Sequence, residues 1–267
     1  MIFQIINEMI KIMIASSPKQ NINQMKKHLA LFLLMGGILL GSSAYAKNKK
    51  ILVFCKTAGF HHDAIKEGIA AIQKLGAENK FDVDSTVNSA KFTDANLKQY
   101  NAVVFLNTTG DVLNDDQQAV FERYIKNGGG FIGVHAASDT EYDWKWYGNL
   151  VGAYFASHPA QQMATIKVTN RDHISTKHLP AEWKRKDEWY NFKWMAEGLN
   201  VLMSIDETTY DAGNGKMGDK HPMAWYHEYD GGRAFYTELG HTAESYQEPL
   251  YLQHLLGGIK YALGLKK

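Results

Sequence analysis

GGGFIGVHAASD, residues 128–139, predicts a short buried strand that runs into a tight turn. The three glycines end the segment before it, and residues 131–134 (FIGV) form an unbroken apolar run. Such runs are typical of strands that are covered on both faces of a parallel sheet. His135 stands at the turn that follows, where a side chain from a strand end can reach a ligand.

The sequence before this stretch repeats the pattern. Residues 51–55 (ILVFC) and 102–106 (AVVFL) are two further apolar runs, and residues 81–87 alternate in the manner of a strand. All three segments are short, and each connection between them has room for a helix or a turn. They therefore predict neighbouring strands of one sheet.

Two helices are predicted between these strands. Residues 63–78 place isoleucines and a leucine at helical spacing, and residues 114–126 turn an apolar face inward. Asn114 stands at the start of the second helix, and Gln117 lies three positions after Asn114, which is the spacing of a capping box. Helices that alternate with buried strands indicate an open, mainly parallel α/β sheet with helices on both faces.

The second half of the chain is less regular. Residues 140–200 are rich in Trp and Tyr, and we expect long aromatic-rich loops over the carboxyl ends of the strands. A strand at 201–205, a hairpin over 223–239 and a last helix from about Glu248 follow. The whole predicts one flavodoxin-like domain over residues 47–267.

Residues 1–46 are set apart from this domain as an upstream extension and a cleaved signal peptide. From Met25 the chain reads MKKHLALFLLMGGILLGSSAYA, a basic start, an apolar run and a small-x-small cleavage site before Lys47. Translation then starts at Met1 or at Met25, and residues 1–24 are expected to precede the true start. The mature protein is predicted to be periplasmic or secreted, with no stable membrane insertion after cleavage.

Charge and cysteine content limit the partners. Of the 29 basic and 28 acidic residues, four lysines and one glutamate lie in residues 1–46, so residues 47–267 carry a net charge of −2. This balance favours neither nucleic acid nor an anionic membrane as a partner. Cys55 is the only cysteine, so no internal disulfide can form, and its apolar surroundings predict an inert buried thiol.

Histidines and carboxylates follow several predicted strands. Because the carboxyl ends of parallel strands meet at one edge of the sheet, these side chains are expected to gather there. The group comprises His61, His62, His135 and His241, with Asp139, Asp143 and Glu188 on the segments that should cover the edge.

Such a group supports two chemistries. Neutral imidazoles at His61, His135 and His241 can hold a divalent cation such as zinc with an open position for substrate. Alternatively, one imidazole moves protons while a carboxylate orients it. The sequence has no HExxH motif to decide between them. His173, His178 and His254 are expected to be structural.

The segment after His135 has the composition of a carbohydrate site. Aromatic rings stack on the C–H faces of sugars, and carboxylates accept hydrogen bonds from hydroxyl groups. The alternative is an aromatic segment that packs on its own domain. The predicted substrate-binding residues are Asp139, Tyr142, Asp143, Trp144, Trp146, His62 and His158.

Three strings resemble the ThuA-like trehalose-utilisation family: GGGFIGVHAASDTEYDWKWYGNLVGAYFASHP, DEWYNF, and the segment from HPMAWYHEYDGG to IKYALG. The resemblance extends from about Lys50 to Leu265. It implies membership of the class I glutamine-amidotransferase-like superfamily, a flavodoxin-like sheet, and a role in the catabolism of trehalose, related disaccharides or 3-keto-glycosides.

The chain departs from that superfamily at its catalytic turn. The superfamily places a cysteine at the centre of a G-x-C-x-G motif, where this sequence reads Gly133-Val134-His135-Ala136-Ala137. An imidazole cannot form the acyl-thioester that glutamine hydrolysis requires. The protein is therefore not expected to be a glutamine amidotransferase, and His135 is free to bind a metal or carry a proton.

The resulting hypothesis is a lyase, hydrolase or isomerase that acts on a disaccharide or a 3-keto-glycoside. His135, His61, His241 and Glu188 are the predicted catalytic residues, with a divalent cation as a possible cofactor. The alternative is a non-catalytic carbohydrate-binding protein, and a third option is an interaction domain with vestigial histidines. The oligomeric state is not predicted.

Overall fold

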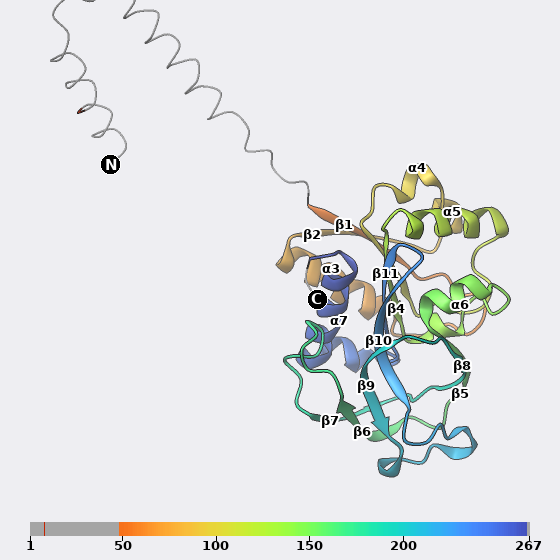
Figure 1. Cartoon of the computed structure of the whole chain (residues 1–267), viewed down its shortest axis with the longest axis vertical. Helices are drawn as coiled ribbons and strands as arrows, with labels where there is room; N and C mark the ends of the chain where they lie inside the picture. The colour runs from red at the N-terminus through yellow and green to blue at the C-terminus, as the bar shows by residue number, and fades with distance from the viewer. Residues whose placement is uncertain (1–7, 9–47, 266–267) are drawn as a thin grey trace, which may run out of the picture. The chain divides into compact units, whose positions relative to one another are not determined.

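A nine-stranded sheet organises the computed structural model, which describes Glu8 and residues 48–265 (Figure 1). Its strand order is β2-β1-β3-β4-β11-β10-β9-β6-β7. The parallel half comprises β2 (Phe81–Thr86), β1 (Lys49–Phe54), β3 (Ala102–Leu106), β4 (Gly130–Val134) and β11 (Gly232–Thr237). The antiparallel half comprises β10 (Pro222–Tyr229), β9 (Asn200–Asp206), β6 (Gln162–Val168) and β7 (Glu182–Asp187).

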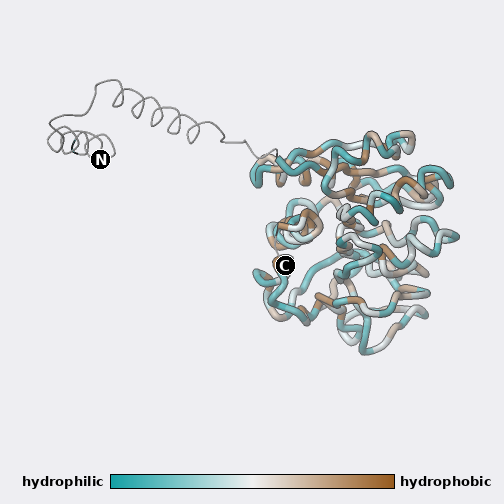
Figure 2. The backbone as a smooth tube through the Cα atoms, turned by 45° about the horizontal axis from the view of Figure 1, so that its top comes forward, coloured by the Kyte–Doolittle hydropathy of each residue, from teal (hydrophilic) through white to brown (hydrophobic). Residues whose placement is uncertain are grey.

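Helices cover both faces of the sheet, as the sequence predicted (Figure 1). One face packs on α3 (Ile65–Asn79) and α7 (Pro249–Ala262). The other packs on α5 (Asp115–Lys126) and α6 (Lys145–Val151), with the short α4 (Asp94–Leu97) beside α5. Figure 2 shows apolar stretches along the strands and on the helices. Each face of the sheet thus has its own hydrophobic core, and the mixed α/β fold class is confirmed.

Local sequence signals explain the helix that precedes β4. Asn114 Oδ1 accepts the Gln117 N–H and Gln117 Oε1 accepts the Asn114 N–H, both at 3.0 Å, which completes the predicted capping box. Phe121 and Ile125 face the core and are fully buried. The helix ends at Lys126, ahead of the glycines, and Gly130 begins β4.

Residues 140–200, expected to form long loops, instead contain α6 and four strands. Two of these strands, β5 (Ala153–Ser157) and β8 (Asn191–Met195), form a separate antiparallel pair. β7 alternates strictly between exposed and buried residues, but two of its three buried side chains are Arg185 and Asp187. Charged residues on the inward face conceal the apolar alternation, so the sequence did not reveal this strand.

Residues Asn48–Lys267 form one compact unit. The predicted signal peptide and the choice between Met1 and Met25 lie outside the described residues. Among the helices that the structure describes, none is both long and apolar enough to cross a membrane.

The capping box at Asn114 gives a first prediction. Replacing Asn114 by Ala removes the acceptor for the Gln117 N–H, and we expect the free energy of unfolding to fall by about 1 kcal/mol. Asn114→Ser retains a capping oxygen and should recover most of the loss. Urea unfolding followed by circular dichroism measures both, and equal stability of the Ala variant and the wild type would contradict the assignment.

Candidate active site

The strand directions bring four site-bearing segments to one edge of the sheet. β1, β3, β4 and β11 are parallel neighbours, so the segments that follow them leave from the same edge. From β11 to β7 the strands β11, β10, β9, β6 and β7 are joined by four antiparallel pairings. Each pairing reverses the strand direction, so β7 runs in the same direction as β11. The carboxyl end of β7, which precedes Glu188, therefore also lies at this edge.

Curvature of the sheet closes the remaining distance. β7 is four strand positions from β11, or about 19 Å across a flat sheet at about 4.8 Å per strand. Nevertheless Asp187 Oδ2 accepts the Gly240 N–H at 3.2 Å. The antiparallel half of the sheet thus curls back until the end of β7 meets the segment that follows β11.

His135 occupies a strained turn directly after β4. Its φ angle is +49°, in the left-handed region that residues with a side chain rarely adopt, and the residue is fully buried. Such strain costs on the order of 1–3 kcal/mol and is concentrated at functional sites. The His135 carbonyl is held by the Tyr236 hydroxyl, which donates to it at 2.7 Å. A short 3₁₀ helix, His135–Asp139, completes a strand–turn–helix elbow.

Hydrogen bonding fixes the tautomer of His135. Its Nδ1 lies 2.6 Å from the backbone carbonyl oxygen of Glu238, which can only accept, so Nδ1 carries a hydrogen. Nε2 faces His241 Nδ1, at 3.1 Å, and Glu188 Oε2, at 3.4 Å. A ring nitrogen that donates to a carbonyl while the other faces a ligand position is the usual arrangement of a metal-binding histidine.

His62, His135, His241 and Glu188 form one group, called the His₃Glu group below. One donor atom from each lies within 4.8 Å of all the others. The three imidazole centroids are 5.0–5.1 Å apart, and the rings are steeply inclined to one another. His241 Nδ1 lies 3.0 Å from Glu188 Oε2. Side chains from four separate segments therefore converge on one point.

The His₃Glu group fits a divalent transition-metal cation. Ligand atoms about 2.0–2.1 Å from a tetrahedral ion are separated by about 3.3 Å, and the contacts among His135, His241 and Glu188 span 3.0–3.4 Å. His62 Nδ1 is buried without a hydrogen-bond partner, an unsatisfied position that a cation nearby would account for. Imidazole nitrogen with carboxylate oxygen suits zinc and its neighbours.

The protonation states also suit a cation. Burial, together with the neighbouring His135 and His241, lowers the pKa of His62 to about 2, so this imidazole is neutral. Burial acts to raise the pKa of Glu188, but hydrogen bonds from His135 and His241 outweigh it and hold the pKa below its usual range. The group therefore offers a carboxylate anion and at least one neutral imidazole as ligands.

Asp187 holds two of the ligand-bearing segments together. Its Oδ1 accepts the Glu188 N–H at 3.0 Å, and its Oδ2 accepts the Gly240 N–H and the Ser245 hydroxyl at 3.2 and 3.1 Å. Arg185 Nη1 lies 3.1 Å from the same oxygen and balances its charge. One buried carboxylate thus fixes the backbone beside Glu188 and the backbone beside His241.

Glu238 lies behind His135. Its Oε1 accepts the Tyr190 N–H at 2.9 Å, and its side chain is fully buried. Burial, reinforced by the nearby carboxylates of Asp187 and Glu188, raises the pKa of Glu238 well above its ordinary value. Neither Glu238 nor Asp187 was among the predicted site residues, although Asp187 adjoins Glu188 in the string DEWYNF.

The structure brings His135, His241 and Glu188 together, but not His61. The His61 side chain is exposed, with Nδ1 3.3 Å from Thr57 Oγ1, and the adjacent His62 points into the group. Two consecutive loop histidines cannot be told apart by spacing alone. His158 also joins the site, since its Nδ1 lies 3.2 Å from Glu188 Oε1 and its side chain is 42% exposed.

The predicted substrate-binding residues of the aromatic segment separate into two sets. Asp139 accepts the Tyr142 hydroxyl at 2.5 Å, and it lies close enough to His135 and His158 to interact with their charges. Burial raises the pKa of Asp139. Asp139 therefore adjoins the His₃Glu group, and Tyr142 is linked to the group through Asp139.

The two tryptophans lie elsewhere. Trp146 donates its indole N–H to Asp230, which precedes β11, whereas His241 follows the other end of that strand. Trp144 stacks on Trp146 with ring centroids 5.1 Å apart. Both rings pack on the core beside α5, and Asp143 is exposed. The structure does not bring Trp144 or Trp146 to the histidines.

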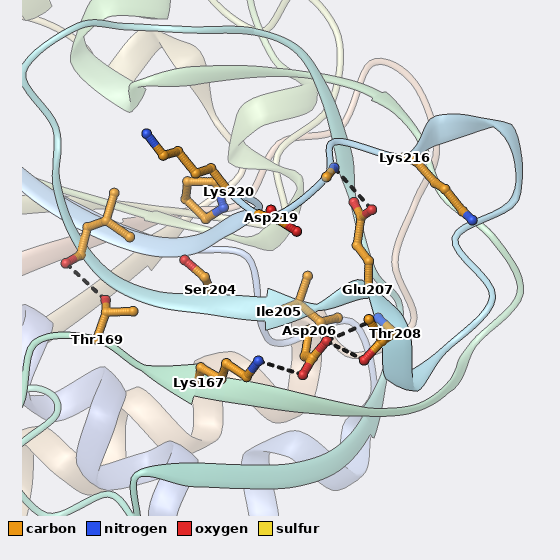
Figure 3. A pocket seen from close by; sticks show the side chains of 13 residues that line it. Lys167, Thr169, Ser204, Ile205, Asp206, Glu207, Thr208, Lys216, Asp219 and Lys220 are labelled. Atoms are coloured by element: carbon orange, nitrogen blue, oxygen red, sulfur yellow. Dashed lines mark hydrogen bonds and ion pairs between the residues drawn. The ribbon is translucent and has the colours of Figure 1, made fainter.

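A cleft of about 790 Å³ lies against β6 and β9, and its lining includes none of these site residues (Figure 3). Lys167 Nζ and Asp206 Oδ2 form an ion pair of 2.6 Å on its wall. Glu207 accepts the Met217 and Gly218 N–H groups and so holds the segment that covers the cleft. Lys167 and Asp206 are thus paired with each other, and the cleft is distinct from the His₃Glu group.

An α/β sheet that gathers histidines and a carboxylate at the carboxyl ends of its strands defines the class of site. Residues 50–262 match the family described as trehalose utilisation (ThuA). The chain belongs to this family, which is related to sugar utilisation. No curated protein matches the sequence.

Solved structures show the same fold. A ThuA-like protein from Bacteroides uniformis is 24% identical with a TM-score of 0.69, over 85% of this chain and 96% of that one. A ThuA-like protein from Parabacteroides merdae is 22% identical with a TM-score of 0.69, over 82% and 91% of the two chains. A β-galactosidase from Bacillus circulans is 15% identical with a TM-score of 0.54, over 82% of this chain and 31% of that one. At these identities the likeness establishes the fold.

The contacts of Asp187 give a second prediction. Asp187→Ala removes one of the two carboxylates that pair with the buried Arg185, and it leaves the Glu188 N–H, the Gly240 N–H and the Ser245 hydroxyl without their acceptor. We therefore expect a loss of about 3–5 kcal/mol in the free energy of unfolding. Ser245→Ala removes a single hydrogen bond to Asp187 and should cost about 1 kcal/mol. Asp94→Asn, which breaks the exposed Asp94–Arg123 pair, is the control and should change stability far less.

Urea unfolding measures the three variants. A loss for Asp187→Ala no larger than that for Asp94→Asn would show that the buried carboxylate does not hold the two segments together.

Proposed function

We propose that the protein is an exported enzyme of sugar catabolism that acts on a disaccharide or a 3-keto-glycoside at the His₃Glu group, with a divalent cation such as zinc. The observation that carries the proposal is the convergence of three imidazoles and one carboxylate within 4.8 Å at the carboxyl edge of the sheet. Clustered ligands of this kind at a strand-end rim are typical of functional sites. Family membership supports a sugar substrate.

The residues of the group would hold the cation, and the chemistry it supplies is polarisation of a carbonyl or hydroxyl oxygen of the substrate. His62, His135 and His241 contribute ring nitrogens, and Glu188 contributes Oε2. Because His135 Nδ1 is bonded to the Glu238 carbonyl and Nε2 faces the group, this residue is better suited to binding than to proton transfer.

His158 is the better candidate for moving a proton. Its Nδ1 contacts Glu188 Oε1 and the Pro159 carbonyl, whereas Nε2 has no hydrogen-bond partner among the described residues. A histidine oriented through one nitrogen by a carboxylate, with the other nitrogen open to solvent, has the arrangement of a general base. Asp139 adjoins it as a second titratable group.

A 3-keto-glycoside suits this arrangement chemically. The carbonyl at C3 acidifies the hydrogen on the neighbouring carbon, so a base can take that proton while the electron pair moves onto the carbonyl oxygen. Return of a proton to another carbon gives isomerisation. Loss of the oxygen at C1, with a proton passed to the leaving group, gives elimination. Addition of water across the resulting double bond gives hydration.

A non-catalytic carbohydrate-binding protein is the alternative. Its proposed platform, Trp144 and Trp146, packs beside α5 at a distance from the histidines, and this removes its main support. Tight sugar binding without any product would favour it over the enzyme.

Metal content tests the group directly. We expect about one equivalent of divalent metal in protein purified without chelators, and a loss of at least tenfold in zinc affinity for His62→Ala, His241→Ala and Glu188→Gln. His61→Ala is the matched control, one position from His62, and should bind zinc normally. Plasma mass spectrometry and a zinc-indicator competition provide the measurements. Loss of binding in His61→Ala with retention in His62→Ala would contradict the assignment.

Turnover tests the role of His158. On 3-keto-glucosides, His158→Gln is expected to lower kcat by about 10²- to 10⁴-fold, because it removes the proton carrier. Its metal content should remain that of the wild type. His178→Gln, whose histidine contacts the Leu250 carbonyl, serves as the control and should retain full activity. An unchanged kcat for His158→Gln would exclude this residue as the base.

A further inference from the structure

Phe60 is the most exposed of the large apolar side chains in the described part of the chain, at 66%. It lies on the segment between β1 and α3, and hydrogen bonds to Thr109 fix the backbone there. The Thr109 carbonyl accepts the Ala58 and Gly59 N–H groups at 2.7 and 3.3 Å, and the Thr109 hydroxyl donates to the Phe60 carbonyl at 2.8 Å. The phenyl ring is therefore held toward solvent by an ordered backbone.

The ring adjoins the His₃Glu group. Its centroid lies 4.9 Å from that of the His62 imidazole, and the two rings are nearly perpendicular at 85°. His62 in turn contacts His135 and His241 at centroid distances of 5.0 and 5.1 Å. A single exposed apolar residue is ordinary on a protein surface, but this one stands one imidazole away from the proposed cation site.

We propose that Phe60 is the stacking platform for the sugar ring that binds at the His₃Glu group, an inference that rests on the proposed function. The C–H bonds on one face of a pyranose carry a small positive charge and favour the electron-rich face of an aromatic ring. Polar groups of the site then remain available to the hydroxyl and carbonyl oxygens. A fixed backbone lowers the entropy lost when the ring engages the ligand.

The surroundings favour a small ligand over a docked protein. Protein interfaces need contiguous apolar area, whereas only one of the four other exposed large hydrophobic residues of the described chain follows a strand that neighbours β1. These are Val87 after β2, Met163 in β6, Trp194 in β8 and Leu265 after α7. His158, with its exposed imidazole bonded to Glu188, supplies a polar group on the carboxylate side of the same site.

Steady-state kinetics and calorimetry on four variants test the platform. The probes are 3-keto-glucosides for KM and the parent disaccharides for Kd, with the full metal-loaded protein. Phe60→Ala is expected to raise KM and Kd by roughly tenfold with kcat within about twofold, because stacking contributes equally to the ground state and the transition state. Phe60→Trp should restore binding. Phe60→Leu should not, since it retains apolar volume but has no aromatic face.

Leu265→Ala is the control. Leu265 is also exposed, and it follows α7, whose last carbonyl, that of Ala262, accepts from Arg233 at the opposite end of β11. Its KM and Kd should equal those of the wild type. Zinc content should be unchanged in every variant.

The outcomes separate this inference from the proposed function. If the wild type turns over sugars and Phe60→Ala keeps its KM, only the platform is refuted. If Phe60→Ala loses zinc and kcat together, Phe60 supports His62 and the platform is likewise refuted. If the wild type neither binds nor converts any of the probes, both the proposed function and the platform fail.

Discussion

The contacts of the Glu188 carboxylate are the constraint on which the site depends. His135 and His241 approach its Oε2 and His158 approaches its Oε1, so three segments of the chain meet at one side chain. A buried carboxylate is stable only when it is paired and hydrogen-bonded. Among the described residues Arg185 is the only buried lysine or arginine, and it is already engaged by Asp187 and Glu248. Positive charge beside Glu188 must therefore come from a proton on a histidine or from a bound cation, and the unsatisfied His62 Nδ1 favours the cation.

The parallel half of the sheet could be predicted because its residues obey simple rules. Unbroken apolar runs identified β1, β3 and β4, and the capping box of Asn114 and Gln117 marked the start of α5. In each case local preference and tertiary environment agree. In β7 they do not, since Arg185 and Asp187 point inward to serve the site. A strand whose inward face is charged has no apolar period for the sequence to display.

Strand direction alone predicted the part of the site that lies at the ends of the parallel strands. Placement at the ends of parallel strands was sufficient to associate His135 with His241, because the topology fixes which edge they share. Glu188 was expected only on a segment that covers this edge, since the strand that precedes it, β7, was not predicted. It could not distinguish His61 from His62, because loop conformation decides which of two neighbours points inward. Composition was a poor guide for Trp144 and Trp146. The indole N–H of a tryptophan can donate to a carboxylate in a structural contact, as Trp146 donates to Asp230, just as it can in a binding site.

The elbow at His135 connects these observations to chemistry. The turn has a positive φ and is fully buried, and its side chain is an imidazole whose Nδ1–H is fixed by the Glu238 carbonyl. A nucleophile must be able to reach the substrate, whereas a ligand must be rigid. Solvent access increases from His135, which is fully buried, through His241 to the exposed His158 and Phe60. The residues that would hold a cation are therefore the buried ones, and the residues that would contact a sugar are exposed to solvent. A binding site needs its central ligands held in place and its outer residues accessible to the substrate.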